Sequence, residues 1–375
     1  MSAGRGRWSW SAHPTRSAAL ASAIPSPANR NRDALAPILA RHPDPRPQPA
    51  SDGVGSVGEG RGCDAAQQKS EVLYRAGARG GPRRARCTHT HDPRQLKIAL
   101  CQTAPTADKA TNIRAATAAI AAAAARGADV VVLPEMWHCP YGAASFPVHA
   151  EDVDGGKSPS ADALAAAARA GNVVVVGGSV AERGQGGKLY NTALVYDSRG
   201  TLLAKHRKAH LFDIDIPGKI TFRESDTLTA GDCVTVVDIG GGVILGVGIC
   251  YDLRFPEYAS LLVSKGASIL VYPGAFNTTT GPAHWELLAR ARAVDAQAFV
   301  ALCSPARDES AGYVAHGHSM VVDPWGVVLV DAGEKEGIVV ADVDLSDVAA
   351  CRAAMPLTAQ RRRDMYELVE TKKRG

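Results

Sequence analysis

The sequence predicts an α/β protein in which two sheets are sandwiched between helices within a single domain. Alanine-rich helical stretches alternate with continuous valine-rich strands over residues 96–176, as in sheets whose faces are covered by helices. Short β segments, some joined by turns rich in glycine and proline, crowd the second half of the chain. A length of 375 residues is enough for one large α/β domain.

The first half of this domain alternates strand and helix. Helices are expected at residues 108–126 and 161–170, because both are alanine-rich and close at a glycine, Gly127 and Gly171. Between and around them, apolar runs predict the strands 96–102, 128–133, 173–176 and 191–196, and a strand that begins at 202 and passes into a polar loop ending at 211.

The second half contains more strands than helices. Residues 233–239 and 243–249 flank three glycines and predict a hairpin. Pro256 opens a helix that runs to residue 265, and a second helix is expected at 284–298. The remaining strands are expected at 268–272, 299–303, 319–322, 327–330 and 338–343. No internal repeat is detectable in the sequence.

Residues 1–93 are predicted to be a leader outside the domain, which occupies residues 94–375. The first 32 residues hold five arginines and many serines but no acidic residue, a composition typical of an organelle transit peptide. Residues 41–62 are rich in proline and glycine and cannot pack a core. We therefore expect a plastid or mitochondrial location, or a cytoplasmic one if the leader does not function.

Charge and cysteine content exclude several classes of protein. Residues 1–95 carry fifteen basic and seven acidic residues, whereas the rest carries 27 basic and 31 acidic residues and is mildly acidic. This balance gives no case for nucleic acid binding, and no apolar run reaches the roughly 20 residues of a membrane span. Eight cysteines without a CxxC pair favour a reduced compartment over a disulfide or zinc scaffold.

Cys250 is the candidate nucleophile. It ends the apolar strand that begins at Val243 and precedes a helix, where α/β proteins commonly place a nucleophile. Glu135 ends another strand and Lys208 follows a third, so all three can meet at one sheet edge. A shielded carboxylate can act as the base and an ammonium can stabilise an oxyanion. The alternatives are a buried core cysteine at 250, a loop carboxylate at 135 and a solvated lysine at 208. A Cys–His pair is also open, with one of the histidines His206, His210 or His284.

Three motifs make the resemblance specific. LPEM at 133–136, KHRKAHLF at 205–212 and GVGICYDLRFPE at 246–257 resemble the signatures of the nitrilase superfamily of carbon–nitrogen hydrolases. The resemblance covers about residues 96–366 and implies an α-β-β-α sandwich with a Glu–Lys–Cys triad at Glu135, Lys208 and Cys250. It also implies a second glutamate, Glu224, that positions the lysine or relays protons. It further implies a homodimer and a reaction without cofactor or metal.

Longer segments are similar to the omega-amidase branch: residues 210–225, 272–297, 304–309 and 317–326. That branch implies hydrolysis of the ω-amide of small 2-oxo acid amides, 2-oxoglutaramate and 2-oxosuccinamate. The alternatives are a sister amidase acting on deaminated glutathione or an N-carbamoyl compound, and an inactive binding or sensor protein of the same fold.

Candidate substrate contacts follow from the charge of such a substrate and from position. Arg254 is a cation near the nucleophile, although it could instead pair with Glu257, and the backbone N–H of Tyr251 is a candidate oxyanion donor. Phe276, Thr279 and Tyr313 are candidates for the pocket wall, with packing as the alternative. His316 and His318 hint weakly at a metal, and a role at a strand edge is preferred.

Overall fold

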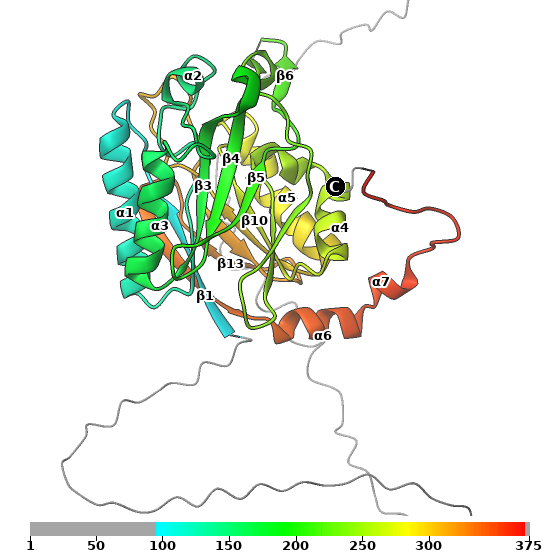
Figure 1. The fold of residues 1–375 in the computed structure, drawn as a ribbon. Coiled ribbons are helices and arrows are strands. Elements are labelled where there is room, and N and C mark those ends of the chain that lie inside the picture. The colour runs from blue at the N-terminus through cyan, green and yellow to red at the C-terminus, as the bar shows by residue number, and fades with distance from the viewer. Residues whose placement is uncertain (1–94, 219, 372–375) are drawn as a thin grey trace, which may run out of the picture. The chain divides into compact units, whose positions relative to one another are not determined.

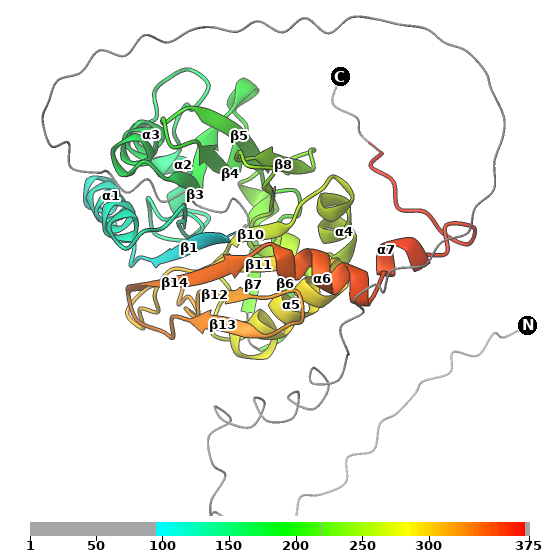
Figure 2. The same ribbon diagram turned by 90° about the horizontal axis from the view of Figure 1, so that it is seen from below.

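In this computed structural model, residues 95–218 and 220–371 are described, and they contain two six-stranded sheets with helices on their outer faces (Figures 1 and 2). The predicted α-β-β-α sandwich is thereby confirmed. The predicted leader, residues 1–93, lies outside the described residues. Among the helices of the described part, none is long and apolar enough to cross a membrane.

The first sheet has the strand order β14-β1-β2-β3-β4-β5. Its outer face is covered by α1 (Lys109–Ala125) and α3 (Pro159–Gly171). Asp108 and Ser158 cap these two helices, because their side chains accept hydrogen bonds from backbone N–H groups of the first turn. The strands are β1 (Gln95–Gln102), β2 (Val130–Val132), β3 (Val174–Arg183), β4 (Leu189–Tyr196), β5 (Leu202–Arg207) and β14 (Gly337–Asp344).

The second sheet has the order β13-β12-β11-β10-β9-β8, and α4 (Pro256–Ser264) and α5 (Gly281–Ala296) cover its outer face. Pro256 begins α4 as predicted, but α5 begins three residues before the predicted His284, because Pro282 also suits a first turn. The strands are β8 (Thr235–Asp238), β9 (Ile244–Val247), β10 (Ile269–Pro273), β11 (Phe299–Cys303), β12 (Met320–Val322) and β13 (Val328–Asp331).

The two sheets share one pattern of strand directions. Read from β14 and from β8, each sheet has one antiparallel pair, then two parallel pairs, then two antiparallel pairs. The fold therefore repeats internally, although no repeat is detectable in the sequence. The repeat lies in the backbone pattern, which many different apolar side chains can satisfy.

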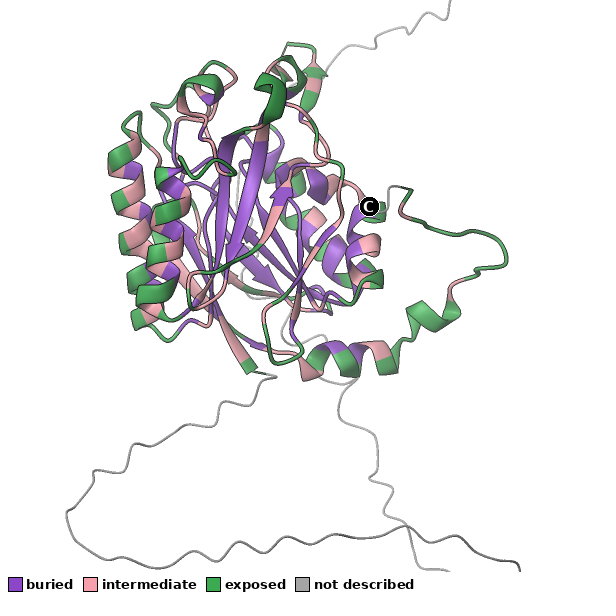
Figure 3. Cartoon of the chain, in the orientation of Figure 1, coloured by how far each residue is buried: buried purple, intermediate pink, exposed green. Residues whose placement is uncertain are grey.

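The core lies between the sheets and beneath the helices. In Figure 3 the strands are mostly buried, and the outward faces of α1 and α3 are exposed. Strands in the middle of both sheets, such as β2, β10 and β11, are buried along their whole length. This explains why they appear in the sequence as continuous apolar runs rather than as alternating patterns.

Several short elements were not predicted. A separate hairpin of β6 (Asp213–Ile216) and β7 (Ile220–Arg223) belongs to neither large sheet. Its strands are four residues long and half polar, so they give a weak sequence signal. The others are the helices α2 (Ser145–His149), α6 (Ser346–Ala354) and α7 (Leu357–Gln360), and 3₁₀ turns at Gln185–Gly187, Glu224–Asp226 and Cys250–Arg254.

Candidate active site

Two glutamates and a lysine form a fully buried cluster at the ends of three strands. Glu135 follows β2, Lys208 follows β5, and Glu224 follows β7; none of the three side chains is exposed. Lys208 Nζ lies 3.0 Å from Glu135 Oε1 and 2.8 Å from Glu224 Oε2. The lysine therefore bridges the two carboxylates. When all three groups are ionised, two negative charges face one positive charge.

Backbone and aromatic groups fix the second glutamate. Glu224 Oε2 accepts a hydrogen bond from the backbone N–H of Phe212 at 2.7 Å, and the Tyr141 hydroxyl donates to Oε1 at 2.9 Å. These donors come from two loops on either side of the lysine, so they hold Glu224 against Lys208 rather than toward solvent. Tyr141 was not predicted from the sequence, because its contact spans 83 residues of chain.

Cys250 stands on a sharp turn between β9 and the helical segment that follows. Its backbone φ is +46°, a left-handed conformation that is uncommon for a residue with a side chain. The thiol is buried, and the backbone N–H of Ala275 donates to its sulfur at 3.4 Å. Strain of this kind at a strand–helix junction is typical of a nucleophile that must present its side chain to a substrate.

Burial and charge set the protonation of these groups. Burial raises the pKa of the Cys250 thiol well above its usual value, and the nearby Glu135 carboxylate raises it further. Burial also raises the pKa of Glu135, although Lys208 offsets part of this effect. Burial alone would lower the pKa of Lys208, but Glu135 and Glu224 raise it well above the usual value. The resting site therefore holds a neutral thiol beside a charged lysine, and the thiol needs a base in order to attack.

Asp252 connects the turn of Cys250 to the loop of Lys208. Its fully buried carboxylate accepts hydrogen bonds from the backbone N–H groups of Ile249 (2.8 Å) and His210 (2.9 Å). The rings of His206 and His210 also contact it, at 3.4 and 2.7 Å. Burial alone would raise the pKa of Asp252, but these hydrogen bonds outweigh it and hold the pKa well below its usual range.

These contacts bear on the predicted Cys–His alternative. His206 and His210 are engaged by Asp252, and His284 contacts Arg254 at 3.2 Å. In residues 95–218 and 220–371, no hydrogen bond joins any of the three rings to Cys250. Glu135 is close enough for its charge to raise the pKa of the thiol, whereas no histidine contributes to that pKa.

A cavity of about 220 Å³ opens beside the cluster. Glu135 and Ala275 line it together with Tyr141 and Tyr313, whose ring centroids are 4.4 Å apart. The Tyr313 hydroxyl donates to Ala275 O at 2.6 Å and so holds this wall against the Cys250 turn. A small amide fits such a space beside the Glu135 carboxylate.

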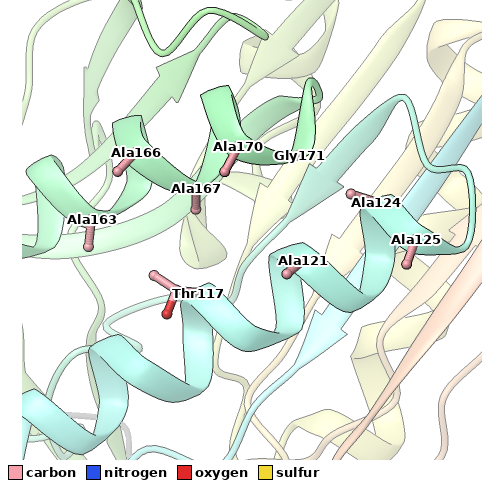
Figure 4. Close-up of a pocket in the computed structure, with 9 residues that line it drawn as sticks. All are labelled: Thr117, Ala121, Ala124, Ala125, Ala163, Ala166, Ala167, Ala170 and Gly171. Atoms are coloured by element: carbon pink, nitrogen blue, oxygen red, sulfur yellow. The ribbon is translucent and has the colours of Figure 1, made fainter.

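A wider hollow of about 590 Å³ lies on the surface between α1 and α3 (Figure 4). Alanines line it, together with Thr117 and Gly171. It presents no titratable side chain, and the Thr117 hydroxyl is directed to backbone oxygens of its own helix, so the hollow is not a candidate active site.

Comparison with known proteins accounts for this arrangement. The carbon–nitrogen hydrolase family matches residues 97–353. The chain belongs to this family. It is 53% identical to the chloroplastic omega-amidase of Arabidopsis thaliana over 74% of this chain and 76% of that protein. It is 51% identical to omega-amidase NIT2 of Bos taurus, over 74% of this chain and 99% of that one.

A solved structure gives the same result for the fold. Nit3 of Saccharomyces cerevisiae, a nitrilase-superfamily member, superimposes with a TM-score of 0.66 at 42% identity, covering 72% of this chain and 97% of Nit3. The predicted membership in the omega-amidase branch of the nitrilase superfamily is thereby confirmed. The chain is a hydrolase of carbon–nitrogen bonds that acts on amides.

Arg254 lies in this hydrolase between two aromatic rings. Its guanidinium carbon is 4.7 Å from the Phe276 ring centroid and 5.5 Å from that of Tyr251. Among the described residues, Arg254 makes no ion pair with Glu257 or with another carboxylate. Burial lowers the pKa of Arg254, and the nearby Cys250 and Tyr251 partly offset this. The alternative prediction, an ion pair between Arg254 and Glu257, is therefore not found in the described part of the structure.

The other predicted contacts differ in position. Phe276 is buried against Trp285, with centroids 4.8 Å apart, and supports Arg254 from below. Thr279 is exposed in the turn before α5, where its backbone N–H donates to Asn277 Oδ1. The structure does not bring its side chain to the cluster.

His316 and His318 stack with centroids 4.5 Å apart in the segment that precedes β12. One nitrogen of each ring, Nδ1, contacts another side chain: Arg307 at 3.0 Å for His316 and Asp331 at 3.0 Å for His318. In the described ranges, no group of three or more histidine, cysteine or acidic side chains is arranged to hold a metal. The predicted role of the two rings at a strand edge stays a prediction.

Proposed function

We propose that the protein is an omega-amidase that hydrolyses the ω-amide of 2-oxoglutaramate and 2-oxosuccinamate. The products are ammonia and 2-oxoglutarate or oxaloacetate. The observation that carries the proposal is the buried cluster of Glu135, Lys208 and Glu224 beside the strained Cys250 turn, in a chain about half identical to omega-amidases.

The proposed reaction assigns one role to each group. Glu135 removes the proton of the Cys250 thiol as the sulfur attacks the amide carbon. Lys208 and the backbone N–H of Tyr251 stabilise the oxyanion of the tetrahedral intermediate. Glu135 then gives the proton to the departing nitrogen, ammonia leaves, and a thioester remains on Cys250. Water, deprotonated by Glu135, then attacks the thioester carbon, the C–S bond breaks, and Glu135 returns the proton to the sulfur of Cys250. Glu224 keeps Lys208 in position throughout.

The raised pKa of Glu135 suits this assignment. A base works best when its pKa lies near the operating pH, and a buried glutamate moves in that direction from its usual value near 4.3. A solvated carboxylate would be too weak to deprotonate a thiol whose own pKa is raised. The site therefore transfers the proton during the attack instead of storing a thiolate.

Arg254 is proposed to bind the carboxylate of the 2-oxo acid. A partly buried guanidinium without an acidic partner among the described residues is a favourable site for an anion. Tyr251 and Phe276 hold it by ring contacts, and His284 occupies Nη1 at 3.2 Å. The edge formed by Nε and Nη2 is proposed to give two hydrogen bonds to the substrate. Thr279 is exposed and does not line the cavity beside the cluster, so the proposal assigns it no role.

The decisive experiment measures ammonia release from 2-oxoglutaramate by the full chain, by Cys250→Ala and by Arg254→Met. We expect no turnover with Cys250→Ala. With Arg254→Met we expect a KM about 10- to 100-fold higher for 2-oxoglutaramate and little change for an uncharged amide such as butyramide. A folded parent without ammonia release would refute the substrate, and deaminated glutathione and N-carbamoyl compounds would then be tested. Full biological activity of Cys250→Ala would favour a sensor protein.

Location and assembly are further parts of the proposal. We infer that residues 1–93 carry the chain into an organelle, plastid or mitochondrion, with residues 94–375 as the catalytic domain. The Arabidopsis relative is named chloroplastic, which supports the plastid. Imaging of fluorescent fusions with and without residues 1–93 tests the location, with cytoplasmic signal from both fusions as the contrary result. Sedimentation of the purified chain tests the proposed homodimer.

A further inference from the structure

Asn191 lies directly behind the proposed base. It belongs to β4, is fully buried, and donates a hydrogen bond from Nδ2 to Glu135 Oε1 at 2.7 Å. Its backbone oxygen accepts a hydrogen bond from the N–H of Lys208 at 2.8 Å. One residue of the first sheet thus contacts both the base and the lysine, through its side chain and its backbone respectively.

The orientation of this amide follows from chemistry. An ionised carboxylate only accepts hydrogen bonds, so the NH₂ end of Asn191 must face Glu135. The opposite end, Oδ1, is buried and has no hydrogen-bond partner within the described part of the chain. A buried amide oxygen without a partner lowers stability, and an apolar residue would avoid this cost. We therefore interpret the Asn191 amide as a hydrogen-bond donor to Glu135 rather than as a packing residue.

The two oxygens of Glu135 are consequently unequal. Oε1 receives both Lys208 Nζ, at 3.0 Å, and Asn191 Nδ2, at 2.7 Å. Oε2 is buried and receives no hydrogen bond from the described residues. An oxygen that already accepts two donors is a weaker base than one that accepts none.

We propose that Asn191 is a positioning residue that clamps Oε1 of Glu135 and so directs Oε2 to the thiol of Cys250. This inference rests on the proposed cysteine chemistry. In the attack step the S–H bond breaks, the Oε2–H bond forms, and the sulfur forms its bond to the amide carbon. The same proton then moves from Oε2 to the nitrogen, the C–N bond breaks, and ammonia leaves.

The clamp has a measurable effect on acid–base behaviour. A hydrogen bond to the carboxylate stabilises its charged form, so loss of the Asn191 donor raises the pKa of Glu135 further. Since the base must be ionised to accept the proton, the acidic limb of the kcat/KM profile moves to higher pH. A residue that only fills space in β4 would change stability without moving this limb.

The experiment compares Asn191→Ala, Asn191→Asp and the control Asn112→Ala. Asn112 is also a buried asparagine, but its amide bonds Thr106 at the start of α1, and no hydrogen bond in the described residues joins it to Glu135, Lys208 or Cys250. For Asn191→Ala we expect kcat/KM about 10- to 100-fold lower and an acidic limb about one pH unit higher, which corresponds to the loss of one hydrogen bond to a charged group. Asn191→Asp keeps the shape of the side chain but places a second carboxylate against Oε1 of Glu135. We therefore expect its kcat/KM to fall further than that of Asn191→Ala. Asn112→Ala leaves the limb where it is.

A second readout does not depend on the substrate. Acrylamide, a small uncharged electrophile, is allowed to alkylate the folded protein at several pH values, and modification of the Cys250 peptide is followed by mass spectrometry. We expect the pH dependence of Cys250 alkylation to move in the same direction in Asn191→Ala. If the parent releases no ammonia from 2-oxoglutaramate, the substrate assignment fails, and alkylation still decides the role of Asn191.

The inference is overturned by a folded Asn191→Ala whose acidic limb and alkylation profile match those of the parent. If Asn191→Ala does not fold, Asn191→Asp decides, because it has nearly the same volume. Thermal unfolding is measured for each variant to show that it is folded. Asn191→Asp with parental stability and an unmoved limb would also overturn the inference.

Discussion

Substitution of Asp252 by asparagine tests the link between the nucleophile turn and the lysine loop. Each carboxylate oxygen accepts one backbone N–H, from Ile249 on one side and from His210 on the other. An amide of the same shape has only one oxygen, so its NH₂ group must face one of these donors whichever way it is turned. The variant therefore loses a charge-assisted hydrogen bond and leaves a buried N–H unsatisfied.

The magnitude follows from these two losses. Loss of the hydrogen bond to a charged group costs about 1.5–3 kcal/mol, and the unsatisfied donor costs about 1–3 kcal/mol more. Together they lower the free energy of unfolding by about 2.5–6 kcal/mol, which corresponds to a fall in Tm of about 4–10 °C for a domain of this size. The Cys250 turn also shifts, so kcat falls about 10-fold or more.

The pH dependence gives an independent check of Asp252. The folded pKa of this carboxylate is depressed, so its stabilisation is complete above the unfolded pKa of about 3.9 and is lost as the pH falls below it. The stability difference between the parent and Asp252→Asn should therefore be full at neutral pH and shrink below about pH 4. Thermal unfolding across pH measures it, with Asp215→Asn, an exposed aspartate of β6, as the control. Equal Tm values for parent and variant at pH 7 would refute the reasoning.

Two further substitutions test the cluster and its support. Lys208→Met removes the cation between Glu135 and Glu224; we expect turnover to fall at least about 1000-fold and stability by about 3–5 kcal/mol, whereas parental ammonia release would exclude Lys208 from the reaction. Gly178→Ala tests the turn that carries Glu135, because a Cβ at this position, with φ +59°, would lie 2.1 Å from Pro134 O. Gly186→Ala has a similar φ and open space around it, so calorimetry should show Gly178→Ala to be about 1–3 kcal/mol less stable than this control.

The sequence predicts those parts of the site that end a regular element. Glu135 and Cys250 follow apolar runs that can only be buried strands, and Lys208 follows a third strand, so their convergence could be expected from the rule for strand ends. Glu224 could be predicted only by resemblance. It follows the β6–β7 hairpin, whose half-polar four-residue strands resemble an exposed loop.

The supporting contacts could not be predicted, because they are made by tertiary packing. Asn191 meets Glu135 across 56 residues of chain, and Asp252 meets His210 across 42. Each would be an ordinary polar residue in a strand or a turn if it were judged from its neighbours. The orientation of an amide or a carboxylate depends on the donors around it, and these come from other strands.

The reacting groups are divided between two structural halves, the two sheets that share one pattern of strand directions. The base and the lysine follow strands of the first sheet, and the nucleophile follows a strand of the second. Proton transfer needs atoms about 3 Å apart, whereas packed sheets lie about 10 Å apart and touch only through side chains. A sliding of one half against the other by about 1 Å would slow the reaction about 100-fold while every strand remained paired. The turnover rate therefore reports a small change in the relative position of the two sheets more sensitively than any spectroscopic measure of secondary structure.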